Sequence, residues 1–158
     1  MKLHPINQLL ALELQDLYSV EHQLLAALPK LTNKATDPNL KKTYQSRLAE
    51  TESRIDRLHQ IRDLLNIDLE GEICARVKGL IHDGEKLFTE DSGELLDQLL
   101  IAASKRIVKY EHAAYGCAIT FARLSKCKPA EKLLKETAAS IARTDKRLTK
   151  MALAELRN

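Results

Sequence analysis

Four long stretches of the chain repeat apolar residues at intervals of three or four, which is the spacing of one face of an α-helix. None of these stretches shows the strict alternation of apolar and polar residues that a half-buried strand requires. Leu and Ala supply most of the repeated positions, Trp is absent, and aromatic residues make up only 4% of the chain. Because Leu and Ala are strong helix formers, this composition favours helix over sheet. The sequence therefore predicts an all-α protein.

Proline and acidic residues indicate where the helices begin. Pro5 and Pro38 suit the first turn of a helix, where a missing N–H group is not needed, and Asp37 can cap the helix that starts at Pro38. We expect helices over 5–34 and 38–66, a third that Asp91 or Ser92 caps and that runs to about 125, and a fourth from 128 onward. The residues predicted to face inward are Leu10, Leu14, Leu17, Leu24 and Leu28 in the first, Leu40, Tyr44, Leu48, Ile55, Leu58 and Leu65 in the second, Leu100, Ile107, Tyr110, Ala114, Cys117, Phe121 and Leu124 in the third, and Ala130, Leu134, Thr137, Ile141 and Leu148 in the fourth.

The stretch from 67 to 93 interrupts this pattern. It contains Gly71, Gly79 and Gly84 and a single short apolar run over 73–81, so we expect a crossover that contains a short helix. Only short links join the first helix to the second and the third to the fourth, so each pair forms an antiparallel hairpin. Two hairpins joined by a long crossover are the arrangement of a ferritin-like four-helix bundle. We expect residues 1–158 to form one such domain.

The overall composition excludes several classes of protein. The 25 basic residues nearly balance the 22 acidic ones, for a net charge of +3, so the strong positive charge of a nucleic-acid-binding protein is absent. No segment approaches the roughly 20 apolar residues of a membrane span, and no secretion signal is evident. Cys74, Cys117 and Cys127 are odd in number and lack zinc-finger spacing, which indicates a reduced, cytoplasmic protein. Cys117 is expected to pack in the core, whereas the reactivity of the other two depends on an exposure that the sequence does not give.

Four glutamates interrupt or flank the apolar stripes. Glu21 lies within the first stripe, four residues after Leu17 and three before Leu24. Glu50 and Glu52 flank the second stripe, and spacing alone does not choose between them. Glu111 flanks the third. Carboxylates that converge from several helices are how helical bundles bind pairs of iron or manganese ions, because hard cations need several anionic oxygens.

The alternative is that these glutamates pair with Arg or Lys or reach solvent, which is the more common arrangement for a glutamate beside an apolar stripe. The fourth helix supports this alternative, because its inner positions Ser140 and Ile141 provide no Glu-x-x-His pair. His59, His82 and His112 are not spaced to share a helix face, so a histidine-rich metal cluster is not expected.

Several motifs together resemble a known family. They are Asp16-Leu17-Tyr18-Ser19-Val20-Glu21 with Ala27-Leu28-Pro29-Lys30, then Glu50-Thr51 with Arg57-Leu58, Cys74 with Gly79-Leu80-Ile81, Tyr110-Glu111 with Ala114-Tyr115-Gly116, and Leu133-Leu134-Lys135-Glu136-Thr137 with Asp145. In this order they resemble the YciE/YciF-type ferritin-like family of bacteria, a stress-associated domain of unknown function. The resemblance implies a fold similar to that of rubrerythrin and ferritin, and it assigns Glu21, Glu50 and Glu111 to the positions of inward acids suspected of binding two metal ions.

The chain departs from the family pattern at these positions. Val108-Lys109 stands where the family usually has Glu-His, Arg47 replaces a usual histidine, and Ala139, Ser140 and Ile141 replace a run of glutamates. We therefore hypothesise that Arg47 or Lys109 occupies the space of the metals and pairs with Glu21, Glu50 or Glu111.

Three functional interpretations follow. The favoured one is a stress-associated protein with a degenerate dinuclear site, no bound cofactor and a structural or partner-binding role rather than an enzymatic one. The first alternative is an iron or manganese oxidase or peroxide scavenger that uses Glu21, Glu50 and Glu111, and the second is an unrelated helical adaptor. Leu9, Leu12 and Leu25 lie off the main stripe, so a homodimer is expected unless the crossover covers them.

Overall fold

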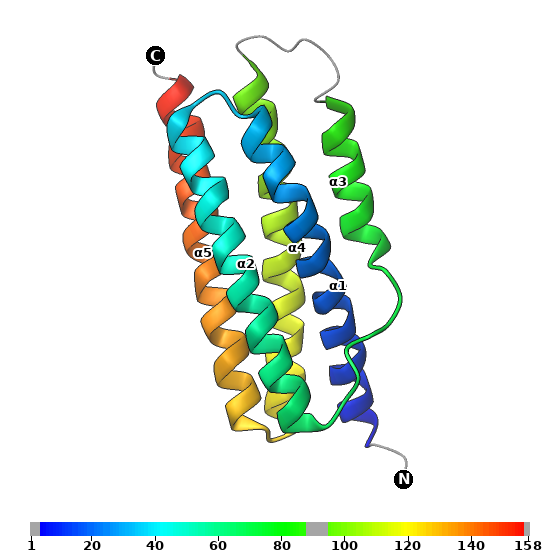
Figure 1. Ribbon diagram of the computed structural model, residues 1–158. Helices are drawn as coiled ribbons and strands as arrows, with labels where there is room; N and C mark the ends of the chain where they lie inside the picture. Colours follow the sequence, from blue (N-terminus) through cyan, green and yellow to red (C-terminus); the bar gives the residue numbers. More distant parts are fainter. Residues whose placement is uncertain (1–3, 88–94, 157–158) are drawn as a thin grey trace.

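The computed structural model describes residues 4–87 and 95–156, which form helices and, within these ranges, no strand (Figure 1). The helices are α1 (Pro5–Lys34), α2 (Pro38–Leu65), α3 (Ala75–Leu87), α4 (Leu96–Leu124) and α5 (Lys128–Leu156). The four long helices form a bundle, and α3 lies along its outside against α4 and α1. Both α1 and α5 pack against α2 and α4, so α1 and α5 occupy opposite corners. The structure confirms the predicted all-α bundle of two antiparallel hairpins with a short helix in the crossover. None of the helices described is long and apolar enough to cross a membrane.

The predicted helix boundaries agree with local capping interactions. Pro5 and Pro38 lie in the first turns of their helices, as expected. The Asp37 carboxylate accepts hydrogen bonds from the N–H groups of Asn39 and Leu40, at 2.6 and 3.3 Å. Helix α2 ends at Leu65, and Asn66 is its C-cap residue. The left-handed backbone of Asn66 (φ 52°) is a conformation that asparagine tolerates. The predicted caps Asp91 and Ser92 lie outside the described residues.

The buried face of α2 differs from the predicted one. Its buried residues include Leu40, Tyr44, Arg47, Thr51, Arg54, Leu58 and Ile61, which recur at alternating intervals of four and three. This is the spacing of left-handed helix packing, and it carries two arginines into the core. Leu48 and Leu65, which we expected to face inward, are only partly buried.

The prediction for α4 is confirmed for Leu100, Ile107 and Ala114, which are buried, but it is wrong towards the end of the helix. Cys117, expected in the core, is exposed, and Leu124 is 60% exposed. The buried positions are instead Ala118 and Ala122, in line with the buried polar residue Glu111. The expected stripe followed apolar residues alone, whereas the true face passes through polar side chains.

The crossover loop, residues 66–74, lies directly on α1. Gln15 donates a hydrogen bond to the carbonyl oxygen of Asp68 at 3.0 Å, and the N–H of Cys74 donates to Ser19 Oγ at 2.9 Å. The loop approaches so closely that a Cβ on Gly71 would lie 3.2 Å from Gln15 Cβ. It nevertheless leaves Leu12 62% exposed. Leu9 is also exposed, and Leu25 is partly buried.

A polar contact between three helices fixes the start of α3. Arg76 of α3 donates hydrogen bonds to Tyr110 Oη of α4 at 2.8 Å and to Asp16 of α1 at 3.1 Å. Tyr110 in turn donates to Asp16 at 2.7 Å. The crossover is therefore attached to both hairpins.

Asp97 performs a similar role at the other end of the bundle. Its carboxylate, at the start of α4, accepts from the N–H and hydroxyl of Thr36 at 2.8 and 2.5 Å and from the N–H of Asp37 at 2.9 Å. Asp97 is only 6% exposed. It therefore joins the link between α1 and α2 to the second hairpin.

We predict that Asp97→Ala lowers the free energy of unfolding by about 2 kcal/mol, because three hydrogen bonds to a buried carboxylate are lost. Urea unfolding followed by circular dichroism measures this value. Asp83→Ala, at an exposed position of α3, is the control and should stay within about 0.5 kcal/mol of the wild type. Equal stability of the two variants would contradict the role given to Asp97.

Candidate functional site

The centre of the bundle contains a charged cluster, which we call the arginine–glutamate cluster. It consists of Glu21 from α1, Arg47 and Arg54 from α2, and Glu111 and Tyr115 from α4. Each of these residues is at most 1% exposed. Burial of so many polar groups is tolerated only when they pair with one another, since an unpaired buried charge is very costly.

Arg54 is the hub of the cluster. Its Nη1 lies 3.2 Å from Glu111 Oε2 and 4.0 Å from Glu21 Oε2. Its Nη2 lies 3.5 Å from Glu50 Oε2 and donates a hydrogen bond to Ser140 Oγ of α5 at 3.2 Å. One guanidinium thus reaches all three of the glutamates that the sequence indicated, as well as the fourth helix of the bundle.

The remaining contacts complete the cluster around Arg54. Arg47 Nη2 donates to Glu111 Oε1, so the Glu111 carboxylate is held by two arginines. Tyr115 donates its hydroxyl to Glu21 Oε1 at 3.0 Å. The planar guanidinium, with its several N–H donors in a fixed fork, suits this shared contact with carboxylates better than a lysine would.

The cluster changes the proton affinity of its members. Burial, and then the neighbouring Glu111 carboxylate, raise the pKa of Glu21 well above its ordinary value. Burial, followed by the charge of Glu21, raises the pKa of Tyr115 as well, so its hydroxyl remains a donor. Burial would lower the pKa of Arg54, but the Glu111 and Glu21 carboxylates outweigh it and the pKa is raised. The surroundings thus raise the pKa values of both Arg54 and Glu21 and shift both groups towards their protonated forms.

The candidate site residues predicted from the sequence lie at different places relative to the cluster. Glu21 and Glu111 lie fully inside the cluster, and Glu50 lies at its edge with its side chain 33% exposed. Arg47 contacts Glu111. Lys109 lies elsewhere: its side chain is 65% exposed and donates to Asp145 Oδ2 at 2.8 Å. The hypothesis that Lys109 fills the metal position is therefore wrong.

Arg54 was missed by the sequence reasoning, although the sequence carries a signal for it. It lies seven residues after Arg47 and four after Glu50, so it shares a helix face with both. With Leu40, Tyr44, Thr51 and Leu58 it continues the four-three repeat of the buried face. A stripe defined by apolar residues alone does not contain this repeat, because Arg47, Thr51 and Arg54 are polar.

The residues of the cluster do not fit a dinuclear metal centre. Such a centre needs several anionic oxygens that converge on an open position. Here the position between Glu21, Glu50 and Glu111 is filled by the Arg54 side chain. In the described ranges, no group of three or more His, Cys, Asp or Glu side chains is arranged to hold a metal ion.

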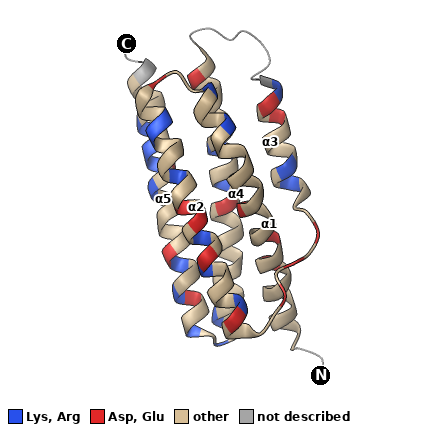
Figure 2. Ribbon diagram, viewed as in Figure 1, with Lys and Arg blue, Asp and Glu red and all other residues tan. Residues whose placement is uncertain are grey.

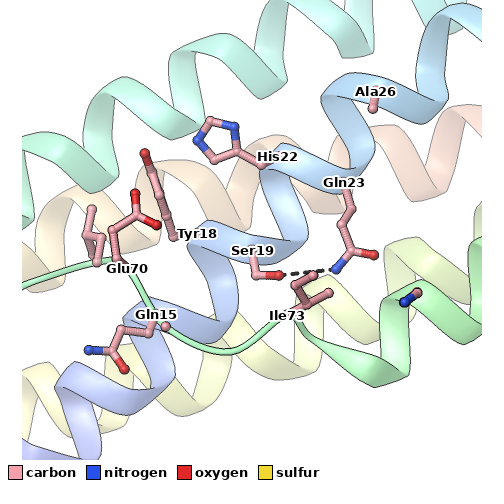
Figure 3. Close-up of a pocket in the computed structure, with 11 residues that line it drawn as sticks. Gln15, Tyr18, Ser19, His22, Gln23, Ala26, Glu70 and Ile73 are labelled. Carbon is pink, nitrogen blue, oxygen red and sulfur yellow. Dashed lines mark hydrogen bonds between the residues drawn. The ribbon is translucent and has the colours of Figure 1, made fainter.

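A surface pocket of about 590 Å³ lies outside the cluster, between α1 and the crossover loop (Figure 3). The Tyr18 ring packs edge-on against His22 in its wall, with 4.4 Å between ring centroids. Gln23 donates to Ser19 Oγ at 3.2 Å and to the carbonyl oxygen of Cys74 at 3.2 Å. Because Ser19 also accepts the N–H of Cys74, these polar side chains hold the loop in place and do not form a nucleophile with an adjacent base.

Comparisons with known proteins agree with this architecture. The DUF892 family, described as a domain of unknown function, matches residues 6–158. Protein YciF of Escherichia coli K12 is 34% identical over 142 residues, which cover 89% of this chain and 86% of that protein. The crystal structure of the E. coli stress protein YciF matches with a TM-score of 0.94, at 31% identity and over 99% of each chain. YcfI of Rhodopseudomonas palustris, for which a structural role has been suggested, matches with a TM-score of 0.89, at 28% identity and over 92% of this chain and 94% of its own.

We predict that Arg54→Met lowers the free energy of unfolding at pH 7 by about 3–5 kcal/mol, because it leaves buried carboxylates without their cation. Urea unfolding measures the loss. The matched control is Arg57→Met, three residues later on α2, which removes one hydrogen bond to Thr137 Oγ1 and should cost about 1 kcal/mol. Similar losses for the two variants would show that Arg54 is not the hub of the cluster.

We also predict that Glu21→Gln flattens the dependence of stability on pH. Because the folded state raises the pKa of Glu21, it binds more protons than the unfolded state, and stability falls as the pH rises above the ordinary glutamate value of 4.5. Glutamine keeps the acceptor for Tyr115 and does not ionise, so the variant should lose less stability between pH 5 and pH 8. Glu52→Gln, at an exposed position, should follow the wild-type curve, and parallel curves for all three proteins would refute the prediction.

Proposed function

The chain belongs to the DUF892 family, and from this premise we propose that it is a YciF-like ferritin-type bundle that works without a metal, as a structural or partner-binding protein and not as an enzyme. The observation that carries the proposal is the position of Arg54, whose guanidinium lies among Glu21, Glu50 and Glu111. A fixed cation at this point takes the place that a metal ion would need.

Charge balance supports the same conclusion. Two divalent metal ions would bring four positive charges into the bundle core. The cluster already holds two arginines against Glu21 and Glu111, with Glu50 at its edge, and the pKa of Glu21 is raised. Additional positive charge would be uncompensated at a buried position and therefore very costly. Over the part of α5 whose burial the structure describes, residues 128–154, the buried polar residues are Thr137, Ser140 and Thr144, and none of these is an anion.

The alternative function, an iron or manganese oxidase or a peroxide scavenger, is not supported by the geometry. Redox chemistry at a dinuclear site requires open coordination positions next to several carboxylates. In this structure the carboxylate oxygens of Glu111 and Glu50 that would bind a metal are already in contact with Arg54.

A structural role is also in keeping with the relatives. YcfI, for which such a role has been suggested, covers nearly the whole of this chain, and YciF is described as a stress protein. We propose that this chain acts in a stress response of the cytoplasm, where its three free cysteines would stay reduced. The exposed Leu9 and Leu12 on α1 favour self-association, of which a homodimer is the simplest form.

We predict that protein produced in medium supplemented with iron and manganese, and purified without chelator, contains less than about 0.1 metal atom per chain by elemental analysis. The unfolding temperature should be the same with about 1 mM Mn²⁺ as with chelator, since a ligand that does not bind the native state cannot stabilise it.

Glu50→Gln tests where a metal would bind, because Glu50, at the edge of the cluster, is the one of the three candidate glutamates whose side chain reaches solvent. Glu52→Gln is the matched control two residues away. Two metal atoms per chain in the wild type and in Glu52→Gln, with a loss in Glu50→Gln, would overturn the proposal.

A further inference from the structure

We propose that α5 binds the phosphate backbone of double-stranded DNA through a stripe of basic side chains on its solvent face. The inference deepens the partner-binding role proposed above and rests on it, because it names the chemistry of the partner. Two observations carry it. They are the uneven distribution of charge between the two hairpins and the spacing of the cations along one helix.

The charge of the chain differs between its first and second parts. Residues 5–87 carry eleven basic and thirteen acidic residues, whereas residues 96–156, which form α4, α5 and the turn between them, carry twelve basic and six acidic ones. Burial of Arg47, Arg54 and Glu21 leaves the first part still more acidic at its surface. The net charge of +3 averages over this asymmetry, which is typical of chains that bind a polyanion through one part.

Helix α4 adds to the positive charge of the second hairpin. Its two acidic residues, Asp97 and Glu111, are both buried. Its basic residues are partly or fully exposed, and they are Lys105, Arg106, Lys109 and Arg123. The solvent face of α4 therefore carries positive charge and no carboxylate.

Six cations of α5 form the basic stripe. They are exposed, and together with Ala139 they recur at intervals of three or four residues, which places them on one face of the helix. They are Lys128, Lys132, Lys135, Arg143, Lys146 and Lys150. Figure 2 shows Lys and Arg at intervals along α5. At 1.5 Å per residue the stripe is about 33 Å long, close to one turn of a DNA duplex.

Acidic side chains beside the stripe do not cancel its charge. Glu131 is only 15% exposed and lies 2.8 Å from Arg123 and 3.1 Å from Lys135. Asp145 is held on the other side of the helix by two lysines of α4, at 3.3 and 2.8 Å. Glu136 is exposed beside the stripe. Over residues 128–154, where the structure describes burial, the solvent face of α5 therefore keeps an excess of cations.

The position of α5 leaves the stripe accessible. The helix packs against α2 and α4 and occupies the corner of the bundle opposite α1 (Figure 1). A homodimer through the exposed Leu9 and Leu12 of α1 would leave the α5 helices of both copies on the outside. An α-helix is about 10–12 Å wide and the major groove of B-DNA is about 12 Å wide, so a corner helix can lie along the groove with its cations beside the phosphates.

The composition of α5 favours duplex DNA over other polyanions. The helix has no aromatic residue on which unpaired bases could stack, and no Asn or Gln to read base edges. Its exposed Leu153 lies beyond Lys150, so the stripe itself offers no large apolar side chain to insert into a bilayer. Contact with backbone phosphates, without sequence preference, is the binding mode that remains.

The test measures the fluorescence anisotropy of a labelled DNA duplex of about 30 base pairs, or about three turns. We expect binding at about 0.05 M NaCl and a loss of about 10³-fold in affinity at about 0.2 M, because six phosphate contacts give a salt slope of about −5. Two duplexes of unrelated sequence should bind within about twofold of each other, since phosphate contacts carry no sequence information.

Two variants of equal charge locate the contact. The stripe variant combines Lys132→Gln, Arg143→Gln and Lys146→Gln. The control variant combines Lys30→Gln, Lys34→Gln and Lys78→Gln, at exposed positions of α1 and α3. The stripe variant should bind at least about tenfold more weakly at about 0.05 M NaCl, with a salt slope reduced to about half, whereas the control should stay within about threefold of the wild type. Circular dichroism should show the same helix content in all three proteins.

Several results would overturn the inference. They are no binding to the duplex at low salt, equal losses in the two variants, tighter binding to single-stranded DNA or duplex RNA of the same length, and binding to vesicles with about 30% phosphatidylserine but not to DNA. A protein without metal that binds no duplex would refute this inference alone, whereas bound metal would refute the proposed function.

Discussion

The structure depends on the contact between Arg54 of α2 and Glu111 of α4. Either side chain alone in the middle of the bundle would be strongly destabilising, and the two can pair only at one relative position of their helices. Glu21 brings α1 to the same guanidinium and Ser140 brings α5. Leucine and alanine side chains tolerate small shifts of one helix along another, because hydrophobic contacts are not directional. We therefore infer that the arginine–glutamate cluster sets the register in which the four long helices pack.

The same contact explains why the bundle centre is not suited to metal chemistry. A guanidinium is a permanent cation attached to the chain, so it neutralises carboxylates without an exchangeable ion and without an open coordination position. Burial and the Glu111 carboxylate raise the pKa of Glu21, which makes its carboxylate a weaker anionic ligand. An architecture similar to that of metal-binding bundles is thus retained with its interior charges balanced by the protein itself.

The sequence allowed a good prediction of the fold, because the signals for it are local. Pro5, Asp37 and Pro38 mark helix ends by their own chemistry, and the long stretch between hairpins follows from its glycines. The site was predicted only in part. Glu21 and Glu111 were found as acids near apolar stripes, but Arg54 was overlooked because its role is visible only once the core is allowed to contain polar residues. Lys109 was misplaced because it lies two residues before Glu111, and therefore on a different face of α4.

The net charge of the chain does not show how its charges are distributed between the core and the surface. Averaged over the chain, 25 basic and 22 acidic residues nearly cancel, and this balance alone indicates no charged partner. The fold shows that the cancellation is local in the core, where Arg54 and Glu111 lie 3.2 Å apart. On the surface it is partial, because Asp145 pairs with Lys105 and Lys109, whereas Glu70 and Lys150 are in no ion pair within the described residues. Charges separated by more than about 10 Å in water at moderate salt hardly stabilise the molecule that carries them. The surface charges that have no close partner therefore contribute little to folding.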